Sequence, residues 1–160
     1  DELVKERQSA KALCKEFNDN PTPENIAKIF GKCGENPWVE PNFWCDYGYN
    51  IKVGDNFYAN HNCVMLDCAE ITFGDNIFIG PNCGFYPPSH PLDATTRNMG
   101  LEFAKAIKVG NSVWFGGNVT VLGGVTIGDN VVIGAGSVVT KDIPSNSVAV
   151  GNPCKVIRKI

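Results

Sequence analysis

The feature that most constrains this chain is an aliphatic, aromatic or cysteine residue that recurs at every sixth position. Three runs share this spacing: Ile51, Phe57 and Cys63; Ile71, Ile77 and Cys83; and Ile107, Val113, Val119, Val125 and Val131. The register extends backward to Cys45 and Val39 and forward to Ser137, where we expect Val138 to take over the packing role. A period of six is neither the 3.6 of a helix nor the simple alternation of an open sheet. Because β-branched residues alternate with Gly and Asn, each repeat predicts a short strand followed by a corner.

Three such repeats close one triangular coil, and stacked coils bury the recurring residue in a column. Turn sequences of the Gly-Asp-Asn type recur between the strands, at 54–56, 74–76 and 128–130. The alternative is a β-sandwich of short strands, but its turns come irregularly and every 8–12 residues. The sequence therefore predicts an all-β solenoid. Its hand does not follow from the period, although the general rule for parallel crossovers is right-handed.

Three segments lie outside the repeat and set the expected organisation. Residues 1–34 are expected to be helical, with an amphipathic helix over 1–17 and a second from Pro23 to about Lys32, capped by Thr22. The β-helix is expected over 35–150, interrupted at 86–106 by a loop whose length suggests a function. Residues 151–160 are expected to leave the solenoid as a C-terminal tail.

Composition narrows the functional class. The 160 residues are 43% apolar, which fits one globular domain. The net charge is −3, and no cluster of Lys and Arg precedes the last few residues, so neither nucleic acid nor a membrane surface is an expected partner. No apolar stretch is long enough to span a membrane. Seven cysteines without a CxxC pair favour buried thiols in a reducing compartment, and hence the cytoplasm.

Several longer motifs are more specific than the repeat. They are Asn-Phe-Tyr-Ala-Asn-His-Asn at 56–62, Ser-His-Pro-Leu-Asp at 89–93, Val-Trp-Phe-Gly-Gly at 113–117, Val-Thr-Lys-Asp-Ile-Pro at 139–144 and Gly-Asn-Pro-Cys-Lys-Val-Ile-Arg at 151–158. Over nearly its whole length the chain resembles the maltose and galactoside O-acetyltransferases, a family of hexapeptide-repeat acyltransferases. Galactoside-type members show two adjacent acidic residues where this chain has Asp67 and Cys68, so the resemblance is closer to the maltose type.

The resemblance implies a left-handed parallel β-helix, which overrides the general rule for the hand. It also implies a homotrimer with active sites between adjacent subunits, acetyl-CoA as co-substrate, a sugar as acceptor and no metal. His90 matches the family's general base, and an imidazole is well suited to take a proton near neutral pH. The alternative is a loop histidine with a structural hydrogen bond. His61, the other histidine, is expected to be a surface or packing residue.

Two further residues are assigned to the reacting centre. Gly117 follows Gly116, and its backbone amide is the candidate donor to the oxyanion of the tetrahedral intermediate. Glu102 is expected either to orient His90 through the second ring nitrogen or to be an exposed loop carboxylate.

By the family motif, Asn60, Asp67 and Asp93 are expected to bind acceptor hydroxyls. Asn60 is equally suited to a left-handed corner, and Asp67 to a turn at the two-residue slip before Ile71.

For the cofactor, Trp114 is expected to pack against the pantetheine arm or simply to cover the solenoid edge. Ala135 would leave room for that arm. The residues assigned to the adenine and 3′-phosphate end are Thr140, Lys141, Lys155 and Arg158. A solvated charged face is the alternative reading of the cations.

These features predict direct acetyl transfer from acetyl-CoA to a sugar such as maltose or glucose, with both substrates bound together. An acetylated cysteine intermediate is disfavoured because most cysteines fit core columns. The acceptor is alternatively an antibiotic or another xenobiotic. A metal lyase of the carbonic anhydrase type would need three imidazoles, and the chain has two histidines. A non-catalytic scaffold would leave the His90 loop without a role.

Overall fold

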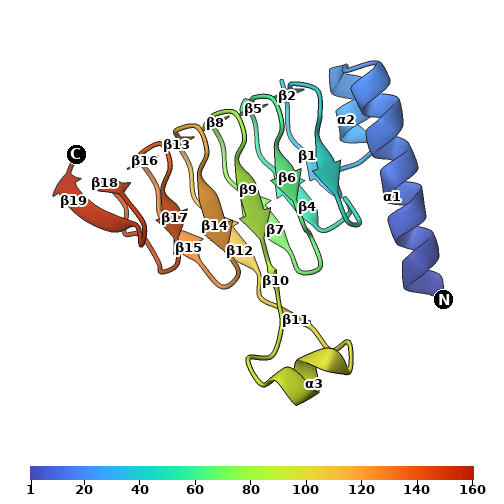
Figure 1. The fold of residues 1–160 in the computed structure, drawn as a ribbon. Coiled ribbons are helices and arrows are strands. Elements are labelled where there is room, and N and C mark those ends of the chain that lie inside the picture. The colour runs from blue at the N-terminus through green and yellow to red at the C-terminus, as the bar shows by residue number, and fades with distance from the viewer.

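The six-residue repeats wind into a parallel β-helix with three walls in the computed structural model, which describes residues 1–160 (Figure 1). The first sheet has five strands in the order β1 (Lys32–Cys33), β4 (Ile51–Val53), β7 (Ile71–Phe73), β12 (Ile107–Val109) and β15 (Thr126–Ile127). The second sheet has seven, β2 (Trp38–Val39), β5 (Phe57–Ala59), β8 (Ile77–Ile79), β13 (Val113–Phe115), β16 (Val131–Ile133), β18 (Ser147–Val150) and β19 (Lys155–Lys159). The third sheet has five, β3 (Trp44–Cys45), β6 (Val64–Met65), β9 (Gly84–Tyr86), β14 (Thr120–Leu122) and β17 (Val138–Val139).

The repeat register predicted from the sequence is the register of the coils. Ile51 pairs with Ile71, and Ile71 with Ile107 across the insertion, so equivalent residues stack directly. All three are fully buried. At the end of the series the expectation for Val138 is wrong, because Ser137 keeps the buried position and Val138 stays partly exposed. Ser137 is tolerated there because its hydroxyl donates to the Gly134 carbonyl at 2.6 Å, which satisfies the buried polar group.

Asparagines hold the corners between strands. Five stacked corner residues have φ between +52° and +58°, a conformation that Asn tolerates better than most residues: Asn36, Asn56, Asn76, Asn130 and Asn146. Their side chains also link the coils, since Asn56 Nδ2 donates to Asn76 Oδ1 at 3.0 Å and Asn130 Nδ2 to Asn146 Oδ1 at 2.9 Å. The corners therefore contribute stacking contacts as well as turns.

A column of aromatic rings runs along the inside of the solenoid. The centroid distances between consecutive rings of Phe30, Phe57, Phe73, Phe85 and Phe115 are 6.1, 5.2, 5.1 and 5.3 Å. Three of the four contacts are edge-to-face, the arrangement that aromatic quadrupoles favour. Phe73 and Phe85 come from the same coil and the other rings from other coils, so the column joins successive coils in a core that no coil could bury alone.

Two helices cover the first coils of the solenoid. Helix α1 (Glu2–Asp19) buries Ala10, Cys14 and Phe17, and helix α2 (Pro23–Ala27) starts at Thr22, whose hydroxyl accepts from the Asn25 amide at 3.1 Å. Thr22 is therefore the predicted N-cap. Helix α2 is shorter than expected, because the chain enters the first sheet as β1, which pairs with β4. The solenoid thus begins within the segment expected to be helical.

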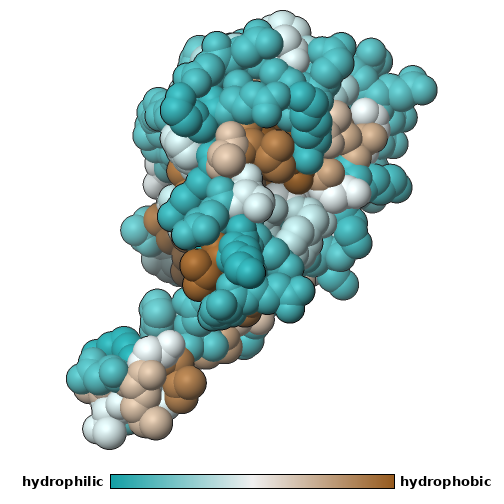
Figure 2. Space-filling model, turned by 90° about the vertical axis from the view of Figure 1, so that its right-hand side faces the viewer, coloured by the Kyte–Doolittle hydropathy of each residue, from teal (hydrophilic) through white to brown (hydrophobic).

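The insertion at 86–106 forms an arm that projects from the solenoid (Figures 1 and 2). Its two sides, β10 (Pro88–Ser89) and β11 (Phe103–Ala104), pair antiparallel, and a short helix, α3 (Ala94–Asn98), lies at its tip. Apolar side chains remain on the arm's surface, with Leu92 96% and Met99 71% exposed. An unpartnered apolar surface of this kind is typical of an interaction site.

The C-terminal segment does not leave the solenoid as expected. Strand β19 folds back antiparallel onto β18 and becomes the outermost strand of the second sheet. None of the helices is long and apolar enough to cross a membrane.

Candidate active site

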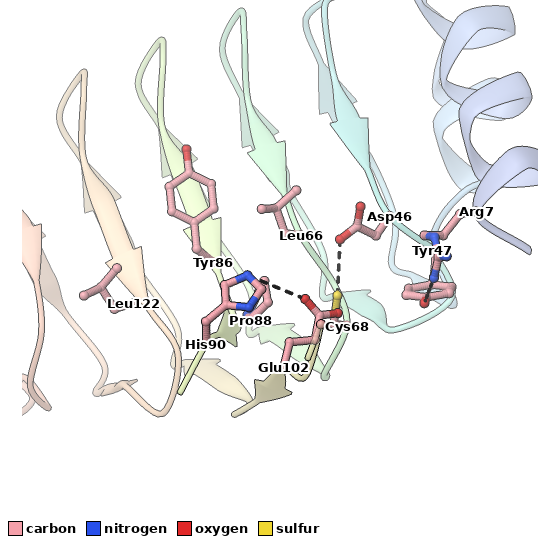
Figure 3. Close-up of a pocket in the computed structure, with 11 residues that line it drawn as sticks. Arg7, Asp46, Tyr47, Leu66, Cys68, Tyr86, Pro88, His90, Glu102 and Leu122 are labelled. Carbon is pink, nitrogen blue, oxygen red and sulfur yellow. Dashed lines mark hydrogen bonds and ion pairs between the residues drawn. The ribbon is translucent and has the colours of Figure 1, made fainter. Parts of the chain in front are cut away.

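The arm leaves the solenoid at the corner that follows the third sheet, and a hollow of about 750 Å³ lies there (Figure 3). We call it the His90 hollow; its polar lining comprises Arg7, Asp46, Tyr47, Cys68, Tyr86, His90 and Glu102. A second hollow of about 400 Å³, the Thr140 hollow, is lined by His90, Lys105 and Thr140 among others. His90 lines both hollows, so one imidazole borders two adjacent binding spaces.

The contacts of His90 indicate which ring nitrogen is free. Its Nδ1 lies 3.3 Å from the carbonyl oxygen of Leu101 on the other side of the arm. A carbonyl can only accept, so this contact favours the tautomer with the proton on Nδ1 and a lone pair on Nε2. Nε2 lies 4.0 Å from Glu102 Oε2, and the His90 side chain is 57% exposed. The Leu101 carbonyl, rather than Glu102, therefore contacts the nitrogen that orients the ring, while Glu102 lies beside the basic nitrogen.

Asp67 does not reach the His90 hollow, which corrects its expected acceptor contact. The side chain is fully buried, and its Oδ1 accepts from the amides of Asp46 and Tyr47 at 3.0 and 2.8 Å. Its Oδ2 accepts from the Asn50 amide at 3.3 Å. Burial raises the pKa of Asp67, while the amide donors oppose that rise. Asp67 is thus the turn-forming residue of the alternative interpretation, and it holds the segment 46–50.

The turn that Asp67 stabilises places Asp46 and Tyr47 in the lining of the hollow. The Asp46 carboxylate accepts a hydrogen bond from the Cys68 thiol, with Sγ 3.3 Å from Oδ2. Burial and that bond raise the pKa of Cys68 to about 12, so the thiol is a protonated donor at neutral pH. Across the hollow, Arg7 Nη1 of α1 donates to the Tyr47 hydroxyl at 2.8 Å.

None of the sequence motifs points to Arg7, Asp46, Tyr47 or Tyr86. A signal for the solenoid residues was available in the coil length. Strand pairing places residues twenty apart at the same point of successive coils, as in Met65 and Phe85. The positions that follow, 46, 66 and 86, therefore share the corner from which the arm departs. Arg7 comes from α1, whose docking no repeat pattern predicts.

Asp93 also lies away from both hollows. It is the N-cap of α3, and its Oδ2 accepts from the Thr96 amide at 2.8 Å and the Thr96 hydroxyl at 2.7 Å. The hydroxyl and amide bonds from Thr96 lower the pKa of Asp93. Asp93 therefore shapes the arm's tip, and its acceptor contact stays a prediction.

Three other predicted residues gather at a different hollow, on the outer surface of the second sheet. Asn60, Trp114 and Gly117 line this Trp114 hollow, which shares no residue with the other two. The Trp114 side chain stands outward and is 56% exposed. Asn60 Oδ1 accepts from the His61 amide at 2.8 Å. The alternative expectation of a left-handed corner at Asn60 is wrong, because Asn56 and Asn62 take the positive φ values in this coil. The structure thus divides the predicted site residues between two faces of one chain.

Gly116 and Gly117 differ in whether the structure has room for a side chain. A Cβ on Gly116 would lie 2.6 Å from the Ala135 amide nitrogen of the next coil, so stacking demands glycine there. A Cβ on Gly117 would meet nothing closer than 3.5 Å. The amides of Gly117 and Ala135 have no acceptor within the chain. Both are therefore free to donate to a bound group.

The cationic residues lie toward the C-terminal end of the solenoid. Lys155 and Arg158 are exposed on β19, at the far edge of the sheet that carries Trp114, and neither pairs with a carboxylate. Lys141 is exposed beside Thr140.

His61 lies outside all three hollows, with Nε2 4.0 Å from Glu40 Oε2. No group of three His, Cys, Asp or Glu residues is arranged to hold a metal ion.

Comparison with known proteins identifies the fold and the chemistry together. Residues 106–141 match the family described as bacterial transferase hexapeptide (six repeats), and residues 1–34 match the maltose acetyltransferase hexapeptide capping motif. A maltose O-acetyltransferase from Clostridium difficile 630 is 52% identical, with a TM-score of 0.95 over 99% of this chain and 88% of that one.

Two further solved structures are similar over the same span. A galactoside acetyltransferase in complex with coenzyme A is 46% identical, with a TM-score of 0.95 over 99% of this chain and 82% of that one. A hexapeptide-repeat acetyltransferase from Vibrio cholerae O1 biovar eltor, complexed with acetyl coenzyme A, is 38% identical, with a TM-score of 0.95 over 99% and 88% of the two chains. The chain therefore belongs to the hexapeptide-repeat acetyltransferases, in the family of the maltose and galactoside acetyltransferases.

Proposed function

We propose that this acetyltransferase moves an acetyl group from acetyl-CoA to a hydroxyl of a sugar such as maltose or glucose, with His90 as general base. The observation that carries the proposal is the position of His90 between two hollows, with Nδ1 against a carbonyl and Nε2 free. Coenzyme A or acetyl coenzyme A occupies relatives of 46% and 38% identity, and a relative of 52% identity is a maltose O-acetyltransferase.

The transfer proceeds in one complex that contains both substrates. His90 Nε2 removes the proton from the acceptor hydroxyl as its oxygen attacks the thioester carbonyl carbon. The tetrahedral intermediate then collapses, the carbon–sulfur bond breaks, and the imidazolium returns the proton to the departing thiolate of coenzyme A. General base catalysis of this kind supplies about 10²–10⁴-fold.

The second face supplies the groups that hold the thioester. The Gly117 amide is the oxyanion donor, because it has no internal acceptor and such donors stabilise charge that develops in the transition state. Trp114 packs against the pantetheine arm and Asn60 contributes to the acceptor site. The free amide of Ala135 binds the pantetheine arm of coenzyme A further from the thioester. Lys141, Lys155 and Arg158 bind the adenine and the 3′-phosphate, together with Thr140 from the hollow that it shares with His90.

An assembly of identical subunits, a homotrimer, completes the site by joining the two faces. The His90 hollow and the Trp114 hollow have no residue in common, so neither face of one chain holds all the proposed groups. The exposed Leu92 and Met99 give the arm an apolar surface for the neighbouring subunit. All seven cysteines are free thiols, in keeping with a reducing, cytoplasmic setting.

The test is the release of free thiol from acetyl-CoA with maltose, glucose, a methyl galactoside and a hydroxylated antibiotic as acceptors. We expect turnover with a sugar and a fall in kcat of about 10²-fold or more for His90→Ala, with acetyl-CoA binding unchanged. His61→Ala is the matched control, because this second exposed histidine lies outside the hollows. A His90→Ala enzyme as fast as His61→Ala would contradict the base assignment. Turnover with the antibiotic alone would make the acceptor a xenobiotic, and coenzyme A binding without any turnover would favour a scaffold.

A further inference from the structure

The carboxylate best placed for the acceptor is Asp46, which the sequence motifs did not single out. Its backbone amide donates to the buried Asp67 carboxylate, and this bond fixes the start of the turn over residues 46–50. Its side chain enters the His90 hollow, where Oδ2 accepts from Cys68 and Oδ1 has no donor within the chain (Figure 3). One oxygen is therefore occupied and the other is open to a ligand.

From this arrangement we infer that Asp46 binds an acceptor hydroxyl through Oδ1, and that the Cys68 thiol is the positioning residue that fixes the Asp46 carboxylate. The inference rests on the proposed acetyl transfer and deepens it. A carboxylate that accepts from a hydroxyl forms a charge-assisted bond, which fixes orientation as well as affinity. His90 lines the same hollow, so a hydroxyl of the same acceptor can reach Nε2 while another is held by Asp46.

Cys68 acts on the carboxylate as a neutral hydrogen-bond donor. A thiol is a weak donor, and the raised pKa keeps it protonated, so it orients Asp46 without neutralising the carboxylate. A second acidic residue at this position would place two like charges together and push one carboxyl toward its protonated form. Asp46 and Cys68 together therefore place a single oriented carboxylate on this side of the His90 hollow.

The charges around the hollow indicate the class of acceptor. Asp46 and Glu102 contribute two carboxylates, whereas the one cation, Arg7, already donates to Tyr47. An anionic acceptor would meet a net negative wall, which is unfavourable. A neutral polyhydroxylated molecule donates to carboxylates without that repulsion. The acceptor class is therefore a neutral sugar with neighbouring hydroxyls.

The experiment measures KM and kcat for maltose, glucose and glucuronate, and KM for acetyl-CoA, in the wild type and in Asp46→Asn, Cys68→Ala and Cys68→Ser. We expect Asp46→Asn to raise the KM of the neutral sugar about 10- to 100-fold with little change in the KM of acetyl-CoA. Cys68→Ala is expected to raise the same KM about 3- to 10-fold, and Cys68→Ser, which keeps a donor, to restore most of it. Glu24→Gln and Cys33→Ala are matched controls outside the hollow.

A second readout does not depend on turnover. Cys68 lines the hollow, so a bound sugar should slow its modification by a small thiol reagent at alkaline pH, where a fraction of the thiol is ionised, and leave Cys33 unaffected, as measured by mass spectrometry of the peptides.

The outcomes separate this inference from the proposed function. Turnover by the wild type with an unchanged sugar KM in Asp46→Asn would overturn the role of Asp46 and leave acetyl transfer intact. Equal loss in Cys68→Ala and Cys68→Ser would refute the positioning role of the thiol. A preference for glucuronate over glucose would overturn the acceptor class. Failure of the wild type to acetylate any sugar, with no protection of Cys68, would refute both proposals.

Discussion

Replacing Asp67 by alanine should loosen the turn that shapes the acceptor side of the His90 hollow. The carboxylate is fully buried and accepts from the amides of Asp46, Tyr47 and Asn50 at 3.0, 2.8 and 3.3 Å. A net contribution of about 1 kcal/mol for each of three bonds gives a loss of about 3 kcal/mol in the free energy of unfolding. The same change should raise the KM for the acceptor, because Asp46 and Tyr47 both line the hollow.

Denaturant unfolding at a fixed protein concentration measures the first effect, since assembly would make stability depend on concentration. Steady-state kinetics measures the second, and the KM for acetyl-CoA should stay unchanged. Asp19→Ala is the control, because its ion pair with Lys15 is exposed and should contribute less than about 1 kcal/mol. An Asp67→Ala protein as stable as Asp19→Ala, with an unchanged acceptor KM, would refute the structural role.

The pH dependence of the stability lost in Asp67→Asn tests the raised pKa of Asp67 separately. Burial raises the pKa of Asp67 in the folded state above its unfolded value, so the folded state binds the proton more tightly. The stability contributed by this titration is fully present below the unfolded pKa and is lost as the pH rises through the folded pKa. Asparagine does not titrate, so its destabilising effect should shrink as the pH rises from acidic values. A destabilising effect that grows over that range would contradict the raised pKa.

Three further changes probe the core, the arm and the cationic edge. Phe85→Ala removes a fully buried ring whose neighbours lie at 5.1 and 5.3 Å, and should lower the free energy of unfolding by about 3–5 kcal/mol in denaturant titrations. Leu92→Asp, at a side chain 96% exposed on the arm, should weaken assembly in sedimentation velocity while the circular dichroism spectrum stays the same; an unaffected oligomer would separate the arm from the interface. Arg158→Ala combined with Lys155→Ala should raise the KM for acetyl-CoA about tenfold or more but leave that for 3′-dephospho-acetyl-CoA unchanged, and equal effects on both would argue against a phosphate contact.

The repeat made the solenoid predictable because a six-residue period leaves few alternatives, and the buried positions Ile51, Ile71 and Ile107 followed directly. Ser137 shows where hydrophobicity misleads, since a hydroxyl with a local carbonyl partner satisfies a buried position that was assigned to Val138. The C-terminal strand β19 was missed because its pairing with β18 is antiparallel and lies outside the repeat.

The candidate site was predictable in part. His90 stood out because it lies in the one long break of the register. A motif match indicates that an acidic residue belongs near a site but not which way it faces, so Asp67 and Asp93 were assigned to the acceptor although one is buried under a turn and the other caps a helix. A prediction of Asp46 would have required the length of one coil. A prediction of Arg7 would have required the docking of α1, which no local pattern encodes.

In the proposed trimer His90 of one subunit works with the face carrying Trp114 on another, and mixing two variants with lesions on opposite faces tests this arrangement. His90→Ala and the double variant Asn60→Ala with Trp114→Ala would be unfolded together, refolded in equal amounts and assayed for acetyl transfer. If each site combines two subunits, random assembly leaves about one quarter of the sites intact, so the mixture should recover about a quarter of wild-type activity. If all the catalytic groups come from a single chain, every site carries a lesion, and a mixture as inactive as its parents would contradict the account.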